Sequence, residues 1–198
     1  MTTDKRCSEI LRDIANDKKL EGNLTFQRIL KILGKRSFGL ALLLFALPSA
    51  LPLSAIPGIS FIFSLPILLF AIQMVVLRES LWLPQAVAKH TINHHTLCKI
   101  IFTSAPYLKK LEKLLKPRLL IMTSRVMLMI NGAVLAFLSC LLMLPIPLSN
   151  FIFSLLIIIF SLGLIEKDGV FIMVGYAGTV LYVSFIYTVI TAAIRLIF

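Results

Sequence analysis

The sequence predicts an all-α membrane protein with about five membrane helices, because its composition is strongly apolar and three long runs carry no charge. Apolar residues make up 59% of the 198-residue chain, and the mean hydropathy is +0.96. A soluble domain has about 45–50% apolar residues. The uncharged runs cover residues 37–77, 126–165 and 169–194. Since a helix needs roughly 20 apolar residues to cross a bilayer, these lengths provide two helical hairpins and one C-terminal helix.

The basic residues predict which side of the membrane the connecting segments occupy. Eighteen of the 20 Lys and Arg residues lie in segments 1–36 and 78–125. The positive-inside rule therefore predicts that both segments, and the N-terminus, are cytoplasmic. The net charge of +11 would also suit a nucleic-acid-binding protein. Because the charge is confined to the flanks of apolar runs, it indicates membrane topology and no nucleic-acid partner.

These patterns divide the chain into five successive segments. We expect a cytoplasmic amphipathic segment at residues 1–36 and a first membrane hairpin at 37–77. A basic cytoplasmic or interfacial helical linker should follow at 78–125. A second membrane hairpin at 126–165 and a C-terminal membrane helix at 169–198 complete the chain. In the linker, leucines surrounded by lysines between Pro106 and Pro117 predict an amphipathic helix that lies on the inner leaflet or packs on the protein. The side of the membrane on which the C-terminus lies stays open.

Prolines mark the apex of each expected hairpin, because proline lacks an amide donor and breaks a helix interior. The first arms should begin near residues 38 and 126, and the second arms should cover residues 59–77 and 148–165. Only 11 residues of the first run precede its first proline, so this arm is either a full span with a bent end or a re-entrant half-span. The helix-breaking apical prolines are Pro48, Pro52 and Pro57 in the first run and Pro145 and Pro147 in the second.

The two hairpins also resemble each other in sequence. Phe61–Leu65 reads FIFSL and recurs 90 residues later as Phe151–Leu155, and at the same separation Pro57 aligns with Pro147. Both hairpins enter and leave on the predicted cytoplasmic side, so they share one orientation. The pattern predicts a parallel internal repeat, related by a pseudo-two-fold axis along the membrane normal.

Residues suited to catalysis or metal binding are not evident. No zinc-protease, serine-hydrolase or nucleotide-binding motif is present, and no carboxylate lies inside an uncharged run. We therefore expect a protein that is not an enzyme, with no catalytic residue, no cofactor and no metal. His90, His94, His95 and Cys98 form the one metal-like group, but three of them in a stripe on a helix would span about 12 Å, too far to share an ion.

Polar and small residues inside the apolar runs suggest contacts between helices. Gln73 and Asn131 are the intramembrane polar residues, and the usual role of such amides is hydrogen bonding between helices. In the last run, Gly175 and Gly178 should allow a neighbouring helix to approach closely.

Arginines at the cytoplasmic ends of the hairpins are the candidate binding residues. Arg36, Arg78 and Arg125 flank apolar runs at ends that should converge in the folded protein. Guanidinium groups bind phosphate bidentately, so these arginines could form a phosphate or lipid-headgroup site. Interfacial anchoring and salt bridges are the alternative role. Lys35 aligns with Arg125 at the separation of 90 residues.

Short motifs in a fixed order resemble those of the ExoD family of exopolysaccharide-synthesis proteins. They are Gly34–Gly39, Ala46–Pro48 with Leu51–Pro52, Gln73, Trp82–Pro84, Pro106 through Leu111–Glu112, Lys116–Leu119 and Glu166–Gly169. The His-rich stretch at 90–95 departs from the basic run expected there. The resemblance implies a protein of the bacterial inner membrane involved in exopolysaccharide synthesis or export. It implies no particular reaction, and its partners would be membrane lipids, a polyprenyl-phosphate-linked saccharide or polysaccharide-assembly proteins.

Three functions remain open from the sequence. The first is a membrane protein that handles or moves a lipid-linked or anionic solute during polysaccharide assembly. The second is a small ion or solute transporter with no polysaccharide role, and the third is a non-catalytic scaffold of an envelope-biosynthesis complex. The parallel repeat, the proline-broken arms and the cytoplasmic arginines favour the first.

Overall fold

Helices dominate the computed structural model of the chain. The structure describes residues 9–10, 13, 24–50, 59–83, 91–92, 110, 113, 115–144 and 149–197. Its α-helices in these ranges are α2 (Phe26–Leu33), α3 (Arg36–Ser49), α4 (Ile59–Val75), α7 (Arg125–Met143), α8 (Ser149–Glu166) and α9 (Gly169–Ile197), and a 3₁₀ turn, η3, covers Leu120–Thr123. The predicted α-helical class is confirmed.

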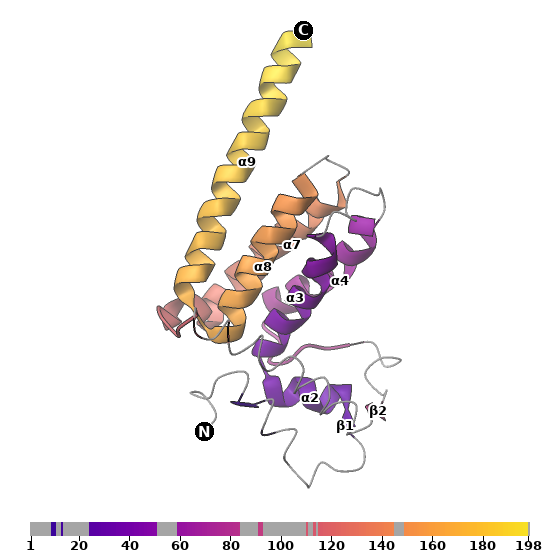
Figure 1. Ribbon diagram of the computed structural model, residues 1–198, viewed down its shortest axis with the longest axis vertical. Coiled ribbons are helices and arrows are strands. Elements are labelled where there is room, and N and C mark those ends of the chain that lie inside the picture. The colour runs from indigo at the N-terminus through magenta and orange to yellow at the C-terminus, as the bar shows by residue number, and fades with distance from the viewer. Residues whose placement is uncertain are drawn as a thin grey trace.

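Four of these helices form a bundle around one apolar core (Figure 1). α3 packs on α4 within the first hairpin, and α7 packs on α8 within the second. The most extensive contacts join the two hairpins, with α4 against α7 and α3 against α8. Large apolar side chains with no exposed surface fill the centre, among them Leu42, Ile67, Leu135, Phe153 and Phe160. The two hairpins therefore share a single core.

The last helix, α9, lies along α8 and then extends past the end of the bundle (Figure 1). Gly175 and Gly178 contact side chains of α8 directly, so the predicted close approach at these glycines is confirmed. Near the first residue of α8, the Tyr182 hydroxyl donates a hydrogen bond to the Ser149 hydroxyl at 3.0 Å. The part of α9 that follows this bond extends beyond the start of α8.

The helix boundaries agree closely with the expected arms. α4 begins at Ile59 as expected, and α7 and α8 each begin within one residue of the expected start. Pro48 lies inside α3, which stops at the next residue, Ser49. Proline cannot donate to the carbonyl of Leu44 four residues earlier, and the helix ends one residue later, where the Ala50 amide donates to the carbonyl of Ala46 at 3.0 Å. The other apical prolines lie outside the described residues.

Three helices are long and apolar enough to cross a membrane, namely α7, α8 and residues 169–192 of α9. α3 and residues 61–75 of α4 are apolar but shorter. The 14 residues of α3 rise roughly 21 Å and the 17 residues of α4 roughly 26 Å. These lengths fit the membrane class predicted from the sequence, with a first hairpin that is shorter than the apolar core of a bilayer, about 30 Å.

Two glycines allow helices of opposite hairpins to approach to backbone contact. A Cβ added at Gly39 of α3 would lie 2.8 Å from the backbone oxygen of Ser161 in α8. A Cβ added at Gly132 of α7 would lie 2.9 Å from the backbone oxygen of Ala71 in α4. Such distances are too short for a side chain, so each interface requires a residue without one.

The helices α4 and α8 end in the same way. Just beyond each helix stands a non-glycine residue in the left-handed region, Leu77 with a φ of 58° and Lys167 with a φ of 55°. The next amide then donates to a carbonyl five residues back, at 3.2 Å for Arg78 and 2.9 Å for Asp168. This arrangement is a Schellman-type closure, which satisfies a terminal helix carbonyl and turns the chain sharply.

The N-terminal segment contributes an amphipathic helix at the end of the bundle away from the C-terminus (Figure 1). In α2, Ile29 and Leu33 are buried, whereas Arg28 and Lys31 are exposed. α2 is therefore amphipathic.

A short strand pair joins the N-terminal segment to the basic linker. Strand β1 (Leu24–Thr25) pairs antiparallel with β2 (Thr91–Ile92). This pairing was not predicted, because two residues are too few to produce a strand pattern in the sequence. Most of the linker helix expected between Pro106 and Pro117 lies outside the described residues.

Replacing either contact glycine by alanine should destabilise the bundle. The added Cβ of Gly39→Ala or Gly132→Ala meets backbone atoms that can move only if a whole helix shifts. We expect a loss of about 1–3 kcal/mol and a lower melting temperature of the detergent-purified protein. Gly178→Ala is the matched control, because its Cβ would meet only the end of the Leu156 side chain. Unchanged melting of both interface variants would contradict the backbone contact.

Candidate functional site

A small pocket lies at the end of the bundle where α3 and α7 begin and α4 ends. Its volume is about 210 Å³. The residues that line it are Lys35, Phe38, Met74, Leu77, Arg78, Glu79, Arg125 and Leu128. The pocket thus combines a charged part with an apolar part contributed by three different helices.

The charges of the pocket are mainly positive. The lining residues include three cations, Lys35, Arg78 and Arg125, and one carboxylate, Glu79, which leaves two net positive charges. Among the described residues, no ion pair within 4 Å joins Glu79 to any of the three cations. The positive charge is therefore available to an anion that enters the pocket.

Two helix N-termini add to this field. Lys35 is the N-cap residue of α3, and Arg125 is the first residue of α7. A helix N-terminus carries roughly half a positive charge, which favours anions within the first turn. α4 contributes its C-terminus, of opposite polarity, but the closure through Leu77 and Arg78 satisfies terminal carbonyls there. The first amides of α3 and α7 are likewise bonded, Ser37 to the Gly34 carbonyl and Met127 to the Ser124 hydroxyl, so the lysine and arginine side chains supply most of the positive charge.

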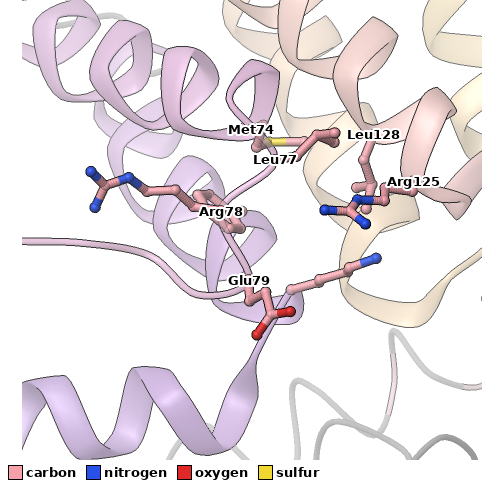
Figure 2. Close-up of a pocket in the computed structure, with 8 residues that line it drawn as sticks. Met74, Leu77, Arg78, Glu79, Arg125 and Leu128 are labelled. Carbon is pink, nitrogen blue, oxygen red and sulfur yellow. The ribbon is translucent and has the colours of Figure 1, made fainter.

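The arginines of the pocket point in different directions (Figure 2). The Arg125 guanidinium points toward the space between α7 and the end of α4, whereas the Arg78 guanidinium points away from it. Arg78 lies over the indole ring of Trp82, 5.8 Å from the ring centre. This is a cation–π contact. Arg125 is therefore the arginine aimed at the pocket, while Arg78 borders it.

Gln73 holds Trp82 in this position. Its side-chain nitrogen donates to the Trp82 carbonyl at 3.1 Å, and its side-chain oxygen accepts from the Trp82 amide at 2.8 Å. Gln73 is buried, so the polar groups of both residues are satisfied where an unpaired amide would be costly. The sequence predicted that Gln73 would bond to a neighbouring helix. It bonds instead to the segment that follows its own helix, α4.

Asn131 has the role expected of a polar residue between helices. Its side chain is fully buried, donates to the Met122 carbonyl at 3.0 Å and accepts from the Tyr176 hydroxyl at 2.6 Å. These bonds join α7 to α9 and to η3. Asn131 thus makes hydrogen bonds between elements, the usual contact of a buried amide in a helix bundle.

The structure brings two of the three predicted arginines to one pocket. Arg78 and Arg125 line it, and Arg36 does not. Arg36 is 7% exposed, and its Nη1 has no hydrogen-bond partner among the described residues. Residues three apart share a helix face, so Arg36 lies on the side of α3 on which Gly39 meets α8. Its neighbour Lys35 lines the pocket instead. The sequence carries a signal for this, because Lys35 and Arg125 occupy equivalent positions at the separation of 90 residues between the two hairpins.

Asp168 organises a second polar cluster that the sequence did not reveal. Its carboxylate accepts from the amides of Lys116 and Val170, each at 3.0 Å. The adjacent amide, of Gly169, donates to the Arg118 carbonyl at 2.7 Å. Asp168 is 1% exposed, so its charge is satisfied by backbone donors, and the linker is fixed to the start of α9.

The metal-like residues of the linker cannot be placed. His90, His94, His95 and Cys98 lie outside the described residues. Within the part of the chain that the structure does describe, no three His, Cys, Asp or Glu side chains gather as a metal site would require.

Comparison with known proteins identifies the family of the chain. The family profile described as "Exopolysaccharide synthesis, ExoD" matches residues 7–188. The chain belongs to the ExoD family. It is 32% identical to Protein ExoD of Rhizobium meliloti over 162 residues, which cover 79% of this chain and 67% of that protein. It is also 33% identical to the uncharacterized protein slr1875 of Synechocystis sp. over 197 residues, or 97% and 92% of the two chains. No solved structure matches.

Several of the ExoD-like motifs lie at one end of the bundle, whereas Ala46–Pro48 lies at the other end of α3. Gly34–Gly39 opens α3 beside the pocket, and Gln73 fixes Trp82 beneath Arg78. Lys116–Leu119 and Glu166–Gly169 meet through the Asp168 cluster, where α8 ends and α9 begins. These segments thus surround the end at which the basic residues of the pocket lie.

Substituting Gln73 should release Trp82. Gln73→Leu removes both bonds to the Trp82 backbone and leaves buried polar groups unpaired, for a loss of about 1–3 kcal/mol. Because Trp82 is the only tryptophan of the chain, its emission should shift to the red. Gln73→Glu keeps an acceptor for the Trp82 amide, so the Trp82 emission should shift less in this variant. An unaltered emission spectrum in Gln73→Leu would show that the amide does not hold the indole.

Proposed function

We propose that this ExoD-family protein is a non-enzymatic, multi-pass protein of the bacterial inner membrane that binds an anionic or lipid-linked solute during exopolysaccharide synthesis or export. The observation that carries the proposal is the pocket in which Lys35, Arg78 and Arg125 outnumber the single acid Glu79. Family membership indicates the process, exopolysaccharide synthesis, and the basic pocket indicates that the ligand is an anion.

The size and charge of the pocket favour a phosphate group as the bound part of the solute. Its volume of about 210 Å³ lies below the roughly 300–1,000 Å³ of ordinary small-molecule sites. A phosphate or diphosphate suits this space better than a whole saccharide unit. The cations Lys35 and Arg125 suit the negative charge of a phosphate, and guanidinium binds phosphate bidentately. The apolar lining residues, such as Phe38 and Leu128, suit an adjoining hydrocarbon part.

The arrangement of the helices supports a cytoplasmic location for the pocket. α3 and α7 begin, and α4 and α8 end, at the same end of the bundle, beside basic segments. By the positive-inside rule this end faces the cytoplasm, with the N-terminus on that side. We infer five membrane helices, of which those of the first hairpin are short.

We also infer that the two hairpins are a parallel repeat. The helix closures at Leu77 and Lys167 lie 90 residues apart. Ala71 and Ser161 are also 90 residues apart, and the backbone of each contacts a glycine of the opposite hairpin. A pseudo-two-fold axis exchanges the α4–α7 and α3–α8 interfaces, and these are the two most extensive ones. Parallel repeats occur in transporters, so movement of the solute across the membrane is the second candidate function.

Loss of a pocket cation should weaken phosphate binding. Titration of the detergent-purified protein with inorganic phosphate, with pyrophosphate and with a short-chain polyprenyl phosphate can be followed through Trp82, because Arg78 contacts both the indole and the pocket. We expect Arg125→Gln and Lys35→Gln to raise the Kd roughly tenfold, a modest effect because the groups are partly exposed. The affinity should fall with added salt.

The controls separate the pocket from general basicity. Arg195→Gln, in the last turn of α9, should bind as the wild type does. Equal affinity of Arg125→Gln, Lys35→Gln and wild type for all three probes would refute the proposed site. If binding is intact and liposomes containing the protein also show phosphate-dependent flux, the transporter function is favoured.

A further inference from the structure

Three large apolar residues project from the protein surface beside the start of α7. Leu119, Leu120 and Ile121 are 52%, 59% and 73% exposed. They lie at and just before the first turn of η3, away from the pocket lining. A consecutive run of exposed apolar side chains is unfavourable in water and indicates a surface that is covered in the working protein.

The backbone beneath this run is held firmly. The preceding residue, Arg118, forms a bridge with Asp168 and accepts from the amide of Gly169 at 2.7 Å. Leu119 has a φ of 50°, in the left-handed region that favours glycine, and a Cβ at Gly169 would lie 2.6 Å from its carbonyl oxygen. Met122 donates its amide to the Leu119 carbonyl at 2.8 Å and packs on the core. The apolar side chains therefore project from a fixed platform, in a conformation that costs energy for leucine.

The surroundings of the run are basic. Lys116 and Arg118 are exposed next to it, and no acidic residue occurs from 115 to 144. Among the described residues, the two acids at the turn that pairs with Arg118, Glu166 and Asp168, are 5% and 1% exposed. The surface thus combines a protruding apolar run with positive charge, which is complementary to an anionic lipid surface.

The position along the bundle fits such a surface. η3 ends just before the first residue of α7 and contacts α9, whose apolar exposed face starts at Val170. The run is therefore level with the boundary between the basic end and the apolar helices.

We propose that Leu119–Ile121 inserts into the cytoplasmic leaflet while Lys116 and Arg118 contact anionic headgroups. The inference rests on the proposed topology but not on the ligand of the pocket. A second copy of the chain is a poorer occupant, because two such surfaces would bring like charges together.

The test places a probe at the tip of the run. In a chain with Cys7, Cys98 and Cys140 replaced by Ser, Ile121→Cys is labelled with an environment-sensitive fluorophore and reconstituted into nanodiscs. We expect an apolar emission spectrum and quenching by lipids brominated near the glycerol. Quenching should increase when phosphatidylglycerol replaces part of the phosphatidylcholine. A water-like, unquenched emission in both lipid mixtures overturns the proposal, and protection of the probe only in native membranes would assign the surface to a protein partner instead.

A matched pair of charge variants tests the headgroup contact. Lys116→Gln with Arg118→Gln should abolish the increase in quenching that phosphatidylglycerol causes. Arg28→Gln with Lys31→Gln removes two exposed cations from α2 and should leave the increase intact. An equal loss in both pairs would mean that overall charge, and not this surface, attracts the lipid. Phosphate binding at the pocket is measured on the same variants and should be unchanged, so failure here is separable from failure of the proposed function.

Discussion

The bundle depends on the absence of side-chain atoms where its two hairpins meet. At Gly39 and at Gly132, helix backbones approach so closely that even a methyl group would meet a carbonyl oxygen within 3 Å. In a membrane, helices gain little from apolar burial against one another, because lipid is as apolar as leucine, so close packing has to supply the stabilisation. The close contacts also fix the height of each helix relative to its neighbour. The starts of α3 and α7 are thereby brought to the level at which Lys35 and Arg125 share one pocket.

Backbone hydrogen bonds close the chain reversals at the same end of the bundle. α4 and α8 both close through a left-handed residue, and the segments that follow are held by Gln73 in one case and Asp168 in the other. Each of these polar side chains satisfies backbone amides that have no carbonyl partner within a helix.

Periodicity and composition were sufficient to predict the helices, because an uncharged run with a proline interruption has few alternatives in a membrane. They predicted the starts of α4, α7 and α8 to within a residue. They could not show which of Lys35 and Arg36 lines the pocket, because neighbouring positions on a helix point about 100° apart and the start of α3 was not known well enough. The roles of Gln73, Trp82 and Asp168 were also out of reach. Each depends on a chain reversal whose geometry is set by a non-glycine residue in the left-handed region, for which the sequence gives no signal.

The unequal lengths of the helices have a consequence for the surrounding lipid. The uncharged part of α9 rises roughly 39 Å, whereas α3 rises roughly 21 Å from the same end of the bundle. No bilayer of uniform thickness matches both, and each ångström of mismatch costs a fraction of a kcal/mol. Lipids beside the first hairpin would have to shorten or tilt, while those beside α9 stay extended. A chain with helices of such unequal length would be most stable where the membrane already changes in thickness.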